Sequence, residues 1–301
     1  MSDYVQQQHT ICNFSNEESW VILSPIEQSI KQKIESVGTP LKDWDIKIYR
    51  GVLTGYNDAF IISTEKRNEI LANCQTEDER LRTAELIRPI LRGRDIKRYG
   101  YDWAGLYLIY IPWHFPLQFD TTITGASEKA ENAFKEQYPA VYTHMLQYKD
   151  SLSKRNKAET GIRYEWYAMQ RWGAKYWDDF FKPKICWASV GETLYSLIPE
   201  GYLLLDTNYF FSIDEPRYLL IVLNSKLITW WINSEDTPIG SGGAFRHYKY
   251  NLEKICIPKF MPNLQTLDLE DFSLKNEFDK QIYLHYGLSE DEIKFIENQF
   301  V

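Results

Sequence analysis

The stretch Ile87-Arg88-Pro89-Ile90-Leu91-Arg92-Gly93-Arg94-Asp95-Ile96-Lys97-Arg98-Tyr99 is the most informative part of this sequence. From Arg88 to Arg98 it carries five cationic side chains and one carboxylate, in a chain of net charge -8. Pro89 and Gly93 interrupt the run, so it cannot form one long solvated helix. We expect a short helix or turn that leads into a strand. Arginine suits a phosphate or guanine edge held by two parallel hydrogen bonds. A solvated surface with a few ion pairs explains the run alone equally well.

The overall composition is that of a globular protein: 44% of the 301 residues are hydrophobic and 15% are aromatic. No apolar run approaches the roughly 18–20 residues of a membrane span. The first residues form neither a basic segment nor an apolar one, so we expect no secretory signal and no membrane partner. The cysteines are scattered without a Cys-x-x-Cys pair, which predicts reduced thiols in a cytoplasmic protein and no structural zinc. They are Cys12, Cys74, Cys186 and Cys256.

The acidic residues are concentrated at the two ends. The net charge is -4 over residues 1–45, +2 over residues 46–263 and -6 over residues 264–301. An acidic total is therefore weak evidence against a nucleic-acid partner, because the central body can still present one cationic face.

Hydrophobic periodicity and turn signals predict an α+β fold with mixed or antiparallel, β-rich character in the middle. We expect a helical linker over residues 1–43, a recognition domain over 44–262 and an acidic helical tail over 263–301 packed on it. The expected helices cover 15–37, restarted at Pro25, and 64–72, 126–152 with a break at Tyr138-Pro139, 217–233 and 289–299. The expected strands cover 44–50, 59–62, 106–111, 184–190, 193–198, 209–213 and 253–258, and an acidic loop precedes the basic run.

Several catalytic motifs are missing from the sequence. There is no Gly-x-Ser-x-Gly elbow, no phosphate-binding Gly-x-x-x-x-Gly-Lys-Ser/Thr loop and no Asn/Asp-Pro-Pro-Tyr/Phe tetrad of amino-methylating enzymes. One alternative is a stand-alone nuclease, in which Glu85 and Asp95 hold Mg²⁺ and Lys97 supports the nucleophile. Acidic-x-Lys triplets are common by chance, however, and the arginines beside Asp95 would offset the charge that a metal needs.

Two further segments combine cations with planar side chains. Residues 149–184 hold nine basic and five acidic residues among several tyrosines and tryptophans. Such a pattern suits phosphate neutralisation with base stacking, although many of these rings could equally be core. The sequence Phe245-Arg246-His247-Tyr248-Lys249 follows the glycine loop 240–243, where backbone amides could approach a phosphate or base edge.

Taken together, these segments resemble the TaqI-like C-terminal specificity domain, the target-recognition region of adenine-N6 DNA methyltransferases and fused restriction-modification enzymes. The resemblance rests on an ordered set of pieces from about residue 44 to 300. They are Ile48–Ile62, Ile87–Tyr99, Lys182-Pro183-Lys184-Ile185, Asp206–Phe210, Leu223–Leu227, Gly242-Gly243 with Phe245-Arg246, Ile257-Pro258 and Tyr286–Ile293.

The resemblance implies a bacterial, cytoplasmic partner of double-stranded DNA that is not catalytic alone. The catalytic half, which uses S-adenosylmethionine, is expected to precede residue 1 in a longer protein or to be a separate subunit; this chain is expected to bind no cofactor or metal. The DNA-binding residues implied are Arg50, Thr54, Tyr56, Asn57, Arg92, Arg94, Lys97, Arg98, Tyr164, Trp166, Arg171, Lys182, Lys184, Ser241, Gly242, Phe245, Arg246 and Lys249. A protein-interaction scaffold built on the 217–233 helix is a third possibility.

Overall fold

The computed structural model describes residues 23–300 of the chain. These residues form two compact units, each assembled from segments distant in sequence. Unit 1 combines the N-terminal segment up to Ile46 with Arg217–Thr237 and the segment from Tyr248 onward, and unit 2 combines Lys47–Pro216 with Pro238–His247. Helices and short antiparallel or mixed sheets are present together, so the predicted α+β class is confirmed.

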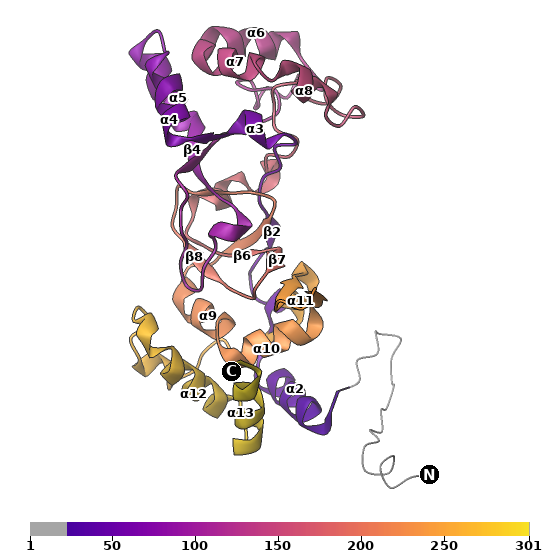
Figure 1. Ribbon diagram of the computed structural model, residues 1–301, viewed down its shortest axis with the longest axis vertical. Helices are drawn as coiled ribbons and strands as arrows, with labels where there is room; N and C mark the ends of the chain where they lie inside the picture. Colours follow the sequence, from indigo (N-terminus) through magenta and orange to yellow (C-terminus); the bar gives the residue numbers. More distant parts are fainter. Residues whose placement is uncertain (1–22, 301) are drawn as a thin grey trace. The chain divides into compact units, whose positions relative to one another are not determined.

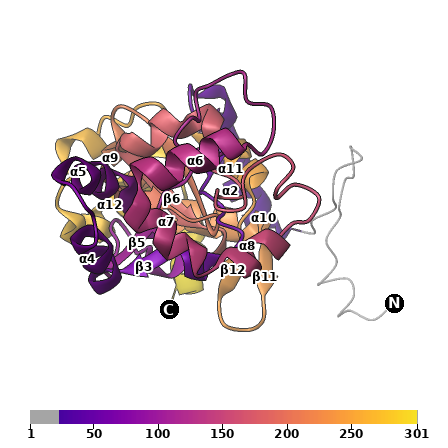
Figure 2. The same cartoon turned by 90° about the horizontal axis from the view of Figure 1, so that it is seen from above.

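Three sheets form the frame of unit 2 (Figure 1). The first is antiparallel, in the order β2 (Tyr49–Arg50), β10 (Asn208–Ser212), β6 (Lys184–Ala188) and β8 (Ser196–Ile198). The second is mixed, in the order β3 (Ile61–Ser63), β5 (Leu106–Ile109), β4 (Ile87–Leu91) and β9 (Leu203–Leu204), with β4 and β9 parallel. The third joins β11 (Thr237–Ile239), β12 (Ala244–Arg246) and β7 (Val190–Gly191). Figure 2 shows the β11–β12 hairpin as a narrow projecting loop.

The main core of unit 2 includes Phe60, Ile90, Leu108, Tyr167 and Phe210, all of which are fully buried. Each such side chain contributes roughly 1.5–3 kcal/mol through burial. Because β6, β4 and β5 present apolar residues to this core, the loops at their ends are held in fixed positions.

The helices of unit 2 begin at conventional caps. Ser63 caps α4, Thr76 caps α5 and Ser127 caps α6, each through a side-chain oxygen that accepts a backbone N–H. The helices are α3 (Asn57–Phe60), α4 (Thr64–Ala72), α5 (Glu77–Leu86), α6 (Glu128–Gln137), α7 (Pro139–Leu146) and α8 (Lys149–Lys154), with 3₁₀ turns η2 (Gly93–Asp95) and η3 (Ala174–Phe181). The predicted helix 64–72 and the predicted break at Tyr138-Pro139 are confirmed.

Among the described residues, unit 1 is mainly helical, with a two-stranded ribbon. Its helices are α2 (Pro25–Val37), α9 (Pro216–Leu223), α10 (Lys226–Glu235), α11 (Lys249–Lys254), α12 (Lys275–His285) and α13 (Glu290–Glu297), and its strands are β1 (Thr39–Pro40) and β13 (Cys256–Ile257). Short 3₁₀ turns are η1 (Leu41–Asp43), η4 (Leu264–Thr266), η5 (Phe272–Leu274) and η6 (Asn298–Phe300). The predicted cap at Ser289 is confirmed, as a capping box with Glu292.

Several predicted boundaries are wrong. The segment before β2 is not a strand, because the N–H groups of Trp44 and Ile46 bond locally to Leu41 and Trp44. The expected acidic loop is helix α5, whose three first-turn carboxylates suit the positive helix terminus. The basic run has the reverse order from that expected: strand β4 comes first and the turn η2 follows.

The remaining differences are found where polar residues cap or end a helix. The expected helix 217–233 is two helices, because Ser225 caps α10 and interrupts the chain after Leu223. Residues Ala59 and Phe60 belong to α3 rather than to a strand, and only Cys256–Ile257 of the expected strand 253–258 is extended. The expected helix 15–37 begins at Pro25, which Ser24 caps; its part before residue 23 lies outside the described residues.

Candidate nucleic-acid interface

A cavity of about 640 Å³ in unit 2 brings together two segments that the sequence singled out separately and one strand that it did not. The 51–57 turn contributes Asn57, and the basic run contributes Arg92, Arg94 and Lys97. The edge strand β7 contributes Val190 and Gly191 in the same lining. We call this cavity, defined by these six residues, the cationic groove.

The turn that carries the arginines is fixed by a hydrogen bond to Thr207 and by packing against Ala188. The N–H of Gly93 donates to Thr207 Oγ1 at 3.0 Å, and a Cβ at residue 93 would meet the Ala188 side chain at 3.4 Å. Ile96, 5% exposed, anchors the end of the turn in the core. The chain therefore bends at residues 93–95 and places successive cations at the groove.

Arg92 is held by the buried carboxylate of Asp95. Its Nη2 lies 2.7 Å from Oδ1, and its Nε and backbone N–H donate to Oδ2 at 3.0 and 2.8 Å. This hydrogen bonding raises the pKa of Arg92 above its ordinary value. The pairing fixes the planar guanidinium group without consuming all of its donors.

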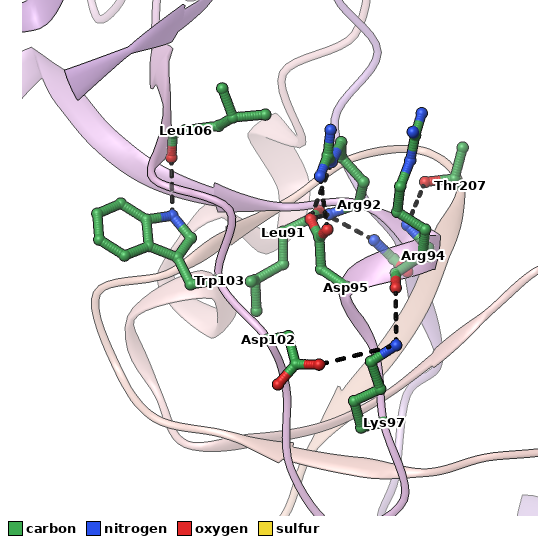
Figure 3. Close-up of polar contacts among 11 residues, drawn as sticks. Leu91, Arg92, Arg94, Asp95, Lys97, Asp102, Trp103, Leu106 and Thr207 are labelled. Carbon is green, nitrogen blue, oxygen red and sulfur yellow. Dashed lines mark hydrogen bonds and ion pairs between the residues drawn. The ribbon is translucent and has the colours of Figure 1, made fainter. Parts of the chain in front are cut away.

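Arg94 and Lys97 remain more open to solvent than Arg92. Within the part of the chain that the structure describes, no carboxylate lies at ion-pair distance from the exposed Arg94. Lys97 Nζ is 3.8 Å from Asp102 and donates weakly to the Arg94 carbonyl at 3.4 Å (Figure 3). Glu192 is the one acidic residue in the lining, against three cations. The groove is thus suited to an anion.

Asn57 is oriented from within its own turn. The buried Thr54 hydroxyl donates to Asn57 Oδ1 at 2.6 Å and accepts the Tyr56 N–H at 3.2 Å. Arg155, 9% exposed, donates to the carbonyls of Thr54 and Ala168. The Asn57 amide nitrogen is left as a hydrogen-bond donor at the groove.

The glycine loop is joined to the groove-lining strand β7 through strand pairing. Phe245 pairs with Gly191 and Arg246 with Val190, both across the β12–β7 ladder. His247 strengthens this edge, because its N–H donates to the Ser189 carbonyl at 3.0 Å. Ser241, Gly242 and Arg246 are exposed, and Phe245 is half-buried. The hairpin is therefore anchored on the strand that lines the groove.

Four of the residues expected to bind DNA are instead part of the interior. Tyr164 is stacked on Trp113 at 4.9 Å, and Trp166 donates to Glu131 at 2.8 Å. Lys184 donates to three carbonyls, at 2.9, 3.0 and 3.3 Å, and its burial lowers its pKa to about 8. Thr54, described above, is 1% exposed. In this structure these buried side chains are not accessible to a DNA duplex.

The other expected residues are found elsewhere on the surface. Arg50 donates to the Asp206 carbonyl at 2.6 Å, and Lys182 pairs with Asp179 at 2.9 Å. Lys249 pairs with Glu253 at 3.2 Å and belongs to unit 1. Tyr56 and Arg98 are half-buried and Arg171 is exposed; none of these lines the groove.

Several observations bear on the residues named for the nuclease and scaffold alternatives. Both carboxylate oxygens of Asp95 accept hydrogen bonds from Arg92, and Glu85 lines a different cavity. Residues 23–300 contain no group of three or more His, Cys, Asp or Glu side chains suited to a metal ion. The apolar residues of α9 and α10 are buried, so they offer no partner surface. No described helix combines the length and the apolar character required to cross a membrane.

Sequence reasoning missed the wall that β7 forms. Val190 is 46% exposed and Gly191 has a φ of 147°, a conformation that favours glycine. The turn-like sequence Val190-Gly191-Glu192-Thr193 was the available signal, but its strand partner is more than fifty residues away in the chain.

A comparison with known protein families agrees with the resemblance seen in the sequence. A family model described as the TaqI-like C-terminal specificity domain matches residues 88–257, which is more than half of the chain. A search of curated proteins found no match.

Among solved structures, the type IIG restriction endonuclease BpuSI is 12% identical, with a TM-score of 0.45 over 85% of this chain and 27% of its own. The type IIL restriction-modification enzyme MmeI, solved in complex with DNA, is 11% identical, with a TM-score of 0.49 over 86% of this chain and 36% of its own. The chain thus spans about a quarter to a third of these structures.

Proposed function

This chain belongs to the TaqI-like C-terminal specificity domain family, and we propose that it recognises a specific sequence in double-stranded DNA for a restriction-modification system. The observation that carries the proposal is the cationic groove, where Arg92, Arg94 and Lys97 lie beside Asn57 and the strand that anchors the β11–β12 hairpin. The net negative charge of the chain does not argue against this proposal, because the groove lining itself is cationic.

The residues of the cationic groove and of the adjoining β11–β12 hairpin divide into two chemical roles. Arg94 and Lys97 are exposed cations suited to DNA phosphates, whose contacts supply salt-dependent affinity but no sequence information. Asn57 and Arg246 are suited to base edges in the major groove, where each good contact supplies roughly 1–3 kcal/mol of discrimination. Arg92, fixed by Asp95, can serve either role.

The catalytic partner is a further part of the proposal. We infer an adenine-N6 methyltransferase catalytic domain or subunit, working in the cytoplasm, that uses S-adenosylmethionine. In that arrangement this chain supplies sequence recognition and the partner supplies the chemistry. Alone, the chain is expected to bind duplex DNA weakly and to leave it unmodified.

The test is a binding selection followed by substitution. Full-length chain is incubated at low salt with a random-sequence duplex pool, and the enriched sequence is used for fluorescence anisotropy. Arg94→Ala should weaken binding and lower the slope of log K against log salt by about 1, since one phosphate contact is lost. Arg246→Ala should instead relax discrimination among bases.

Arg163→Ala is the matched control, because Arg163 is exposed and pairs with Glu159 outside the groove. Its binding should equal that of the wild type. No enrichment from the pool, or unchanged binding by Arg94→Ala, would contradict the proposal.

A further inference from the structure

A second cavity in unit 2, of about 230 Å³, is lined chiefly by aromatic rings. Tyr110 and Trp177 are stacked with ring centroids 4.0 Å apart and an interplanar angle of 19°. Trp172 packs edge-on against Tyr110 at 6.4 Å and receives a hydrogen bond from the Tyr110 hydroxyl on its carbonyl. Tyr138 lines the same space. We call this cavity, bounded by these four rings, the aromatic pocket.

Two arginines accompany the rings of the aromatic pocket. Arg82, on α5, lies over the Tyr138 ring at 5.7 Å, and Arg88, on β4, lies over the Phe181 ring at 5.8 Å. Neither guanidinium group has a carboxylate at ion-pair distance among residues 23–300. Glu85 is the one acid in the lining, so the pocket combines stacking surfaces with a net positive charge.

A hydrogen-bond acceptor in the lining lacks a donor. The terminal oxygen of Gln118 is buried and accepts no hydrogen bond from the described residues. A buried polar atom is ordinarily paired, so this oxygen suits the N–H of a ligand. Phe119 follows it, 78% exposed and part of the same lining, where its ring can cover a bound ligand.

We propose that the aromatic pocket binds a nucleotide, with the base stacked among the rings and the phosphate held by Arg82 and Arg88. The volume corresponds to about seven or eight water molecules at ~30 Å³ each, which suits a single base with its phosphate outside at the mouth. Stacking on aromatic rings accepts any base, and arginine grips phosphate with two parallel hydrogen bonds. Gln118 accepts the base N–H.

The nucleotide could be a free mononucleotide or an unpaired nucleotide of bound DNA. The proposal does not depend on the cationic groove, because none of the residues lining one cavity lines the other. The two sources share one chemistry and can be separated by the choice of probe.

The experiment is calorimetric titration of the full chain with four probes: dAMP, inorganic phosphate, a paired duplex and the same duplex with one unpaired nucleotide. A free-nucleotide site binds dAMP, more tightly than phosphate alone. A DNA-borne site instead favours the duplex with the unpaired nucleotide over the paired one. Whichever source applies, Arg82→Gln and Gln118→Leu should each lower the affinity for the favoured probe. The loss should be about tenfold or more for the arginine variant.

Arg80→Gln is the matched control, because Arg80 is on the same helix but pairs with Glu77. It should bind as the wild type does, and thermal melts of all variants check folding. The proposal is overturned if dAMP is not favoured over phosphate and the unpaired nucleotide is not favoured over the paired duplex, or if both pocket variants bind like the wild type. Paired-duplex binding that depends on Arg94 would survive any of these failures.

Discussion

The guanidinium group of Arg92 holds both carboxylate oxygens of Asp95, with Nη2 2.7 Å from Oδ1 and Nε 3.0 Å from Oδ2. Asp95 is 4% exposed, so the pair is a buried constraint on the turn as well as a charge interaction. It makes the geometry of the cationic groove depend on a residue that does not line it.

Replacing Asp95 by Asn should therefore affect both stability and binding. We expect the free energy of unfolding to fall by about 1–3 kcal/mol, since Arg92 loses a charged partner in a buried site. Duplex affinity should fall with it, because the guanidinium group is no longer fixed. Urea unfolding and fluorescence anisotropy measure the two effects. Asp102→Asn, at a side chain 81% exposed, should leave the unfolding free energy unchanged and should not weaken duplex binding; equal losses in both variants would refute the idea.

Arg155 should act on the groove from the interior. It donates to the carbonyls of Thr54, Trp166 and Ala168, and burial lowers its pKa to about 10. Arg155→Lys keeps the charge but cannot reach all three carbonyls with one ammonium group. We expect a loss of about 2–3 kcal/mol in unfolding free energy and weaker duplex binding, because the turn that carries Asn57 loosens. If Arg155→Lys had wild-type stability, the arrangement of several N–H donors on one guanidinium group would be unimportant here.

Lys184 should give stability a measurable pH dependence. Its pKa is lowered by burial from 10.5 to about 8, so between these values the unfolded chain binds a proton that the folded chain does not. The unfolding free energy should therefore rise with pH across this window, by at most about 3 kcal/mol from this residue. Other groups titrate there too, so the quantity to measure is the difference between wild type and Lys184→Met. Lys175→Met, at an exposed position, should leave the slope unchanged.

Glu292 should control how the stability of unit 1 falls at acid pH. Burial alone would raise its pKa, but hydrogen bonds from Lys33, Ser29 and Ser289 lower it to about 2. Its stabilisation is present above pH 4.5 and is lost as pH falls towards 2, with a full value of up to about 3 kcal/mol. Glu292→Gln should remove this acid-dependent part in urea titrations at several pH values. Glu290→Gln, on the exposed side of the same helix, should cost less than about 1 kcal/mol.

Local signals were enough to predict the fold class and several elements. The helix Thr64–Ala72 and the break before Pro139 follow from caps and proline, which act within a few residues. The acidic segment before β4, predicted as a loop, carries an equally local helix signal, the Thr76 cap with three carboxylates after it. Errors of this kind are avoidable, because the information lies in the sequence.

The candidate site was predictable only in part. The basic run and Asn57 do meet at one cavity, as their residue types suggested. Composition could not distinguish Tyr164 and Lys184, which are buried, from exposed residues of the same kind, because burial depends on which parts of the folded chain pack against each residue. Gly191 lines the cationic groove on a strand that is formed by pairing with Phe245. No local sequence pattern predicts this pairing.

The tip of the β11–β12 hairpin gives the protein a simple route to diversification. Gly240 and Gly243 have φ values of 64° and 72°, so they preserve the bend, whereas Gly242 has an unstrained φ and no heavy atom within 4 Å of where a Cβ would lie. A new side chain at residue 242 would neither clash nor unfold anything, and it would project from the hairpin that the groove-lining strand anchors. A single codon change could then alter target preference while leaving the scaffold intact, which makes this position a natural starting point for evolving new specificities.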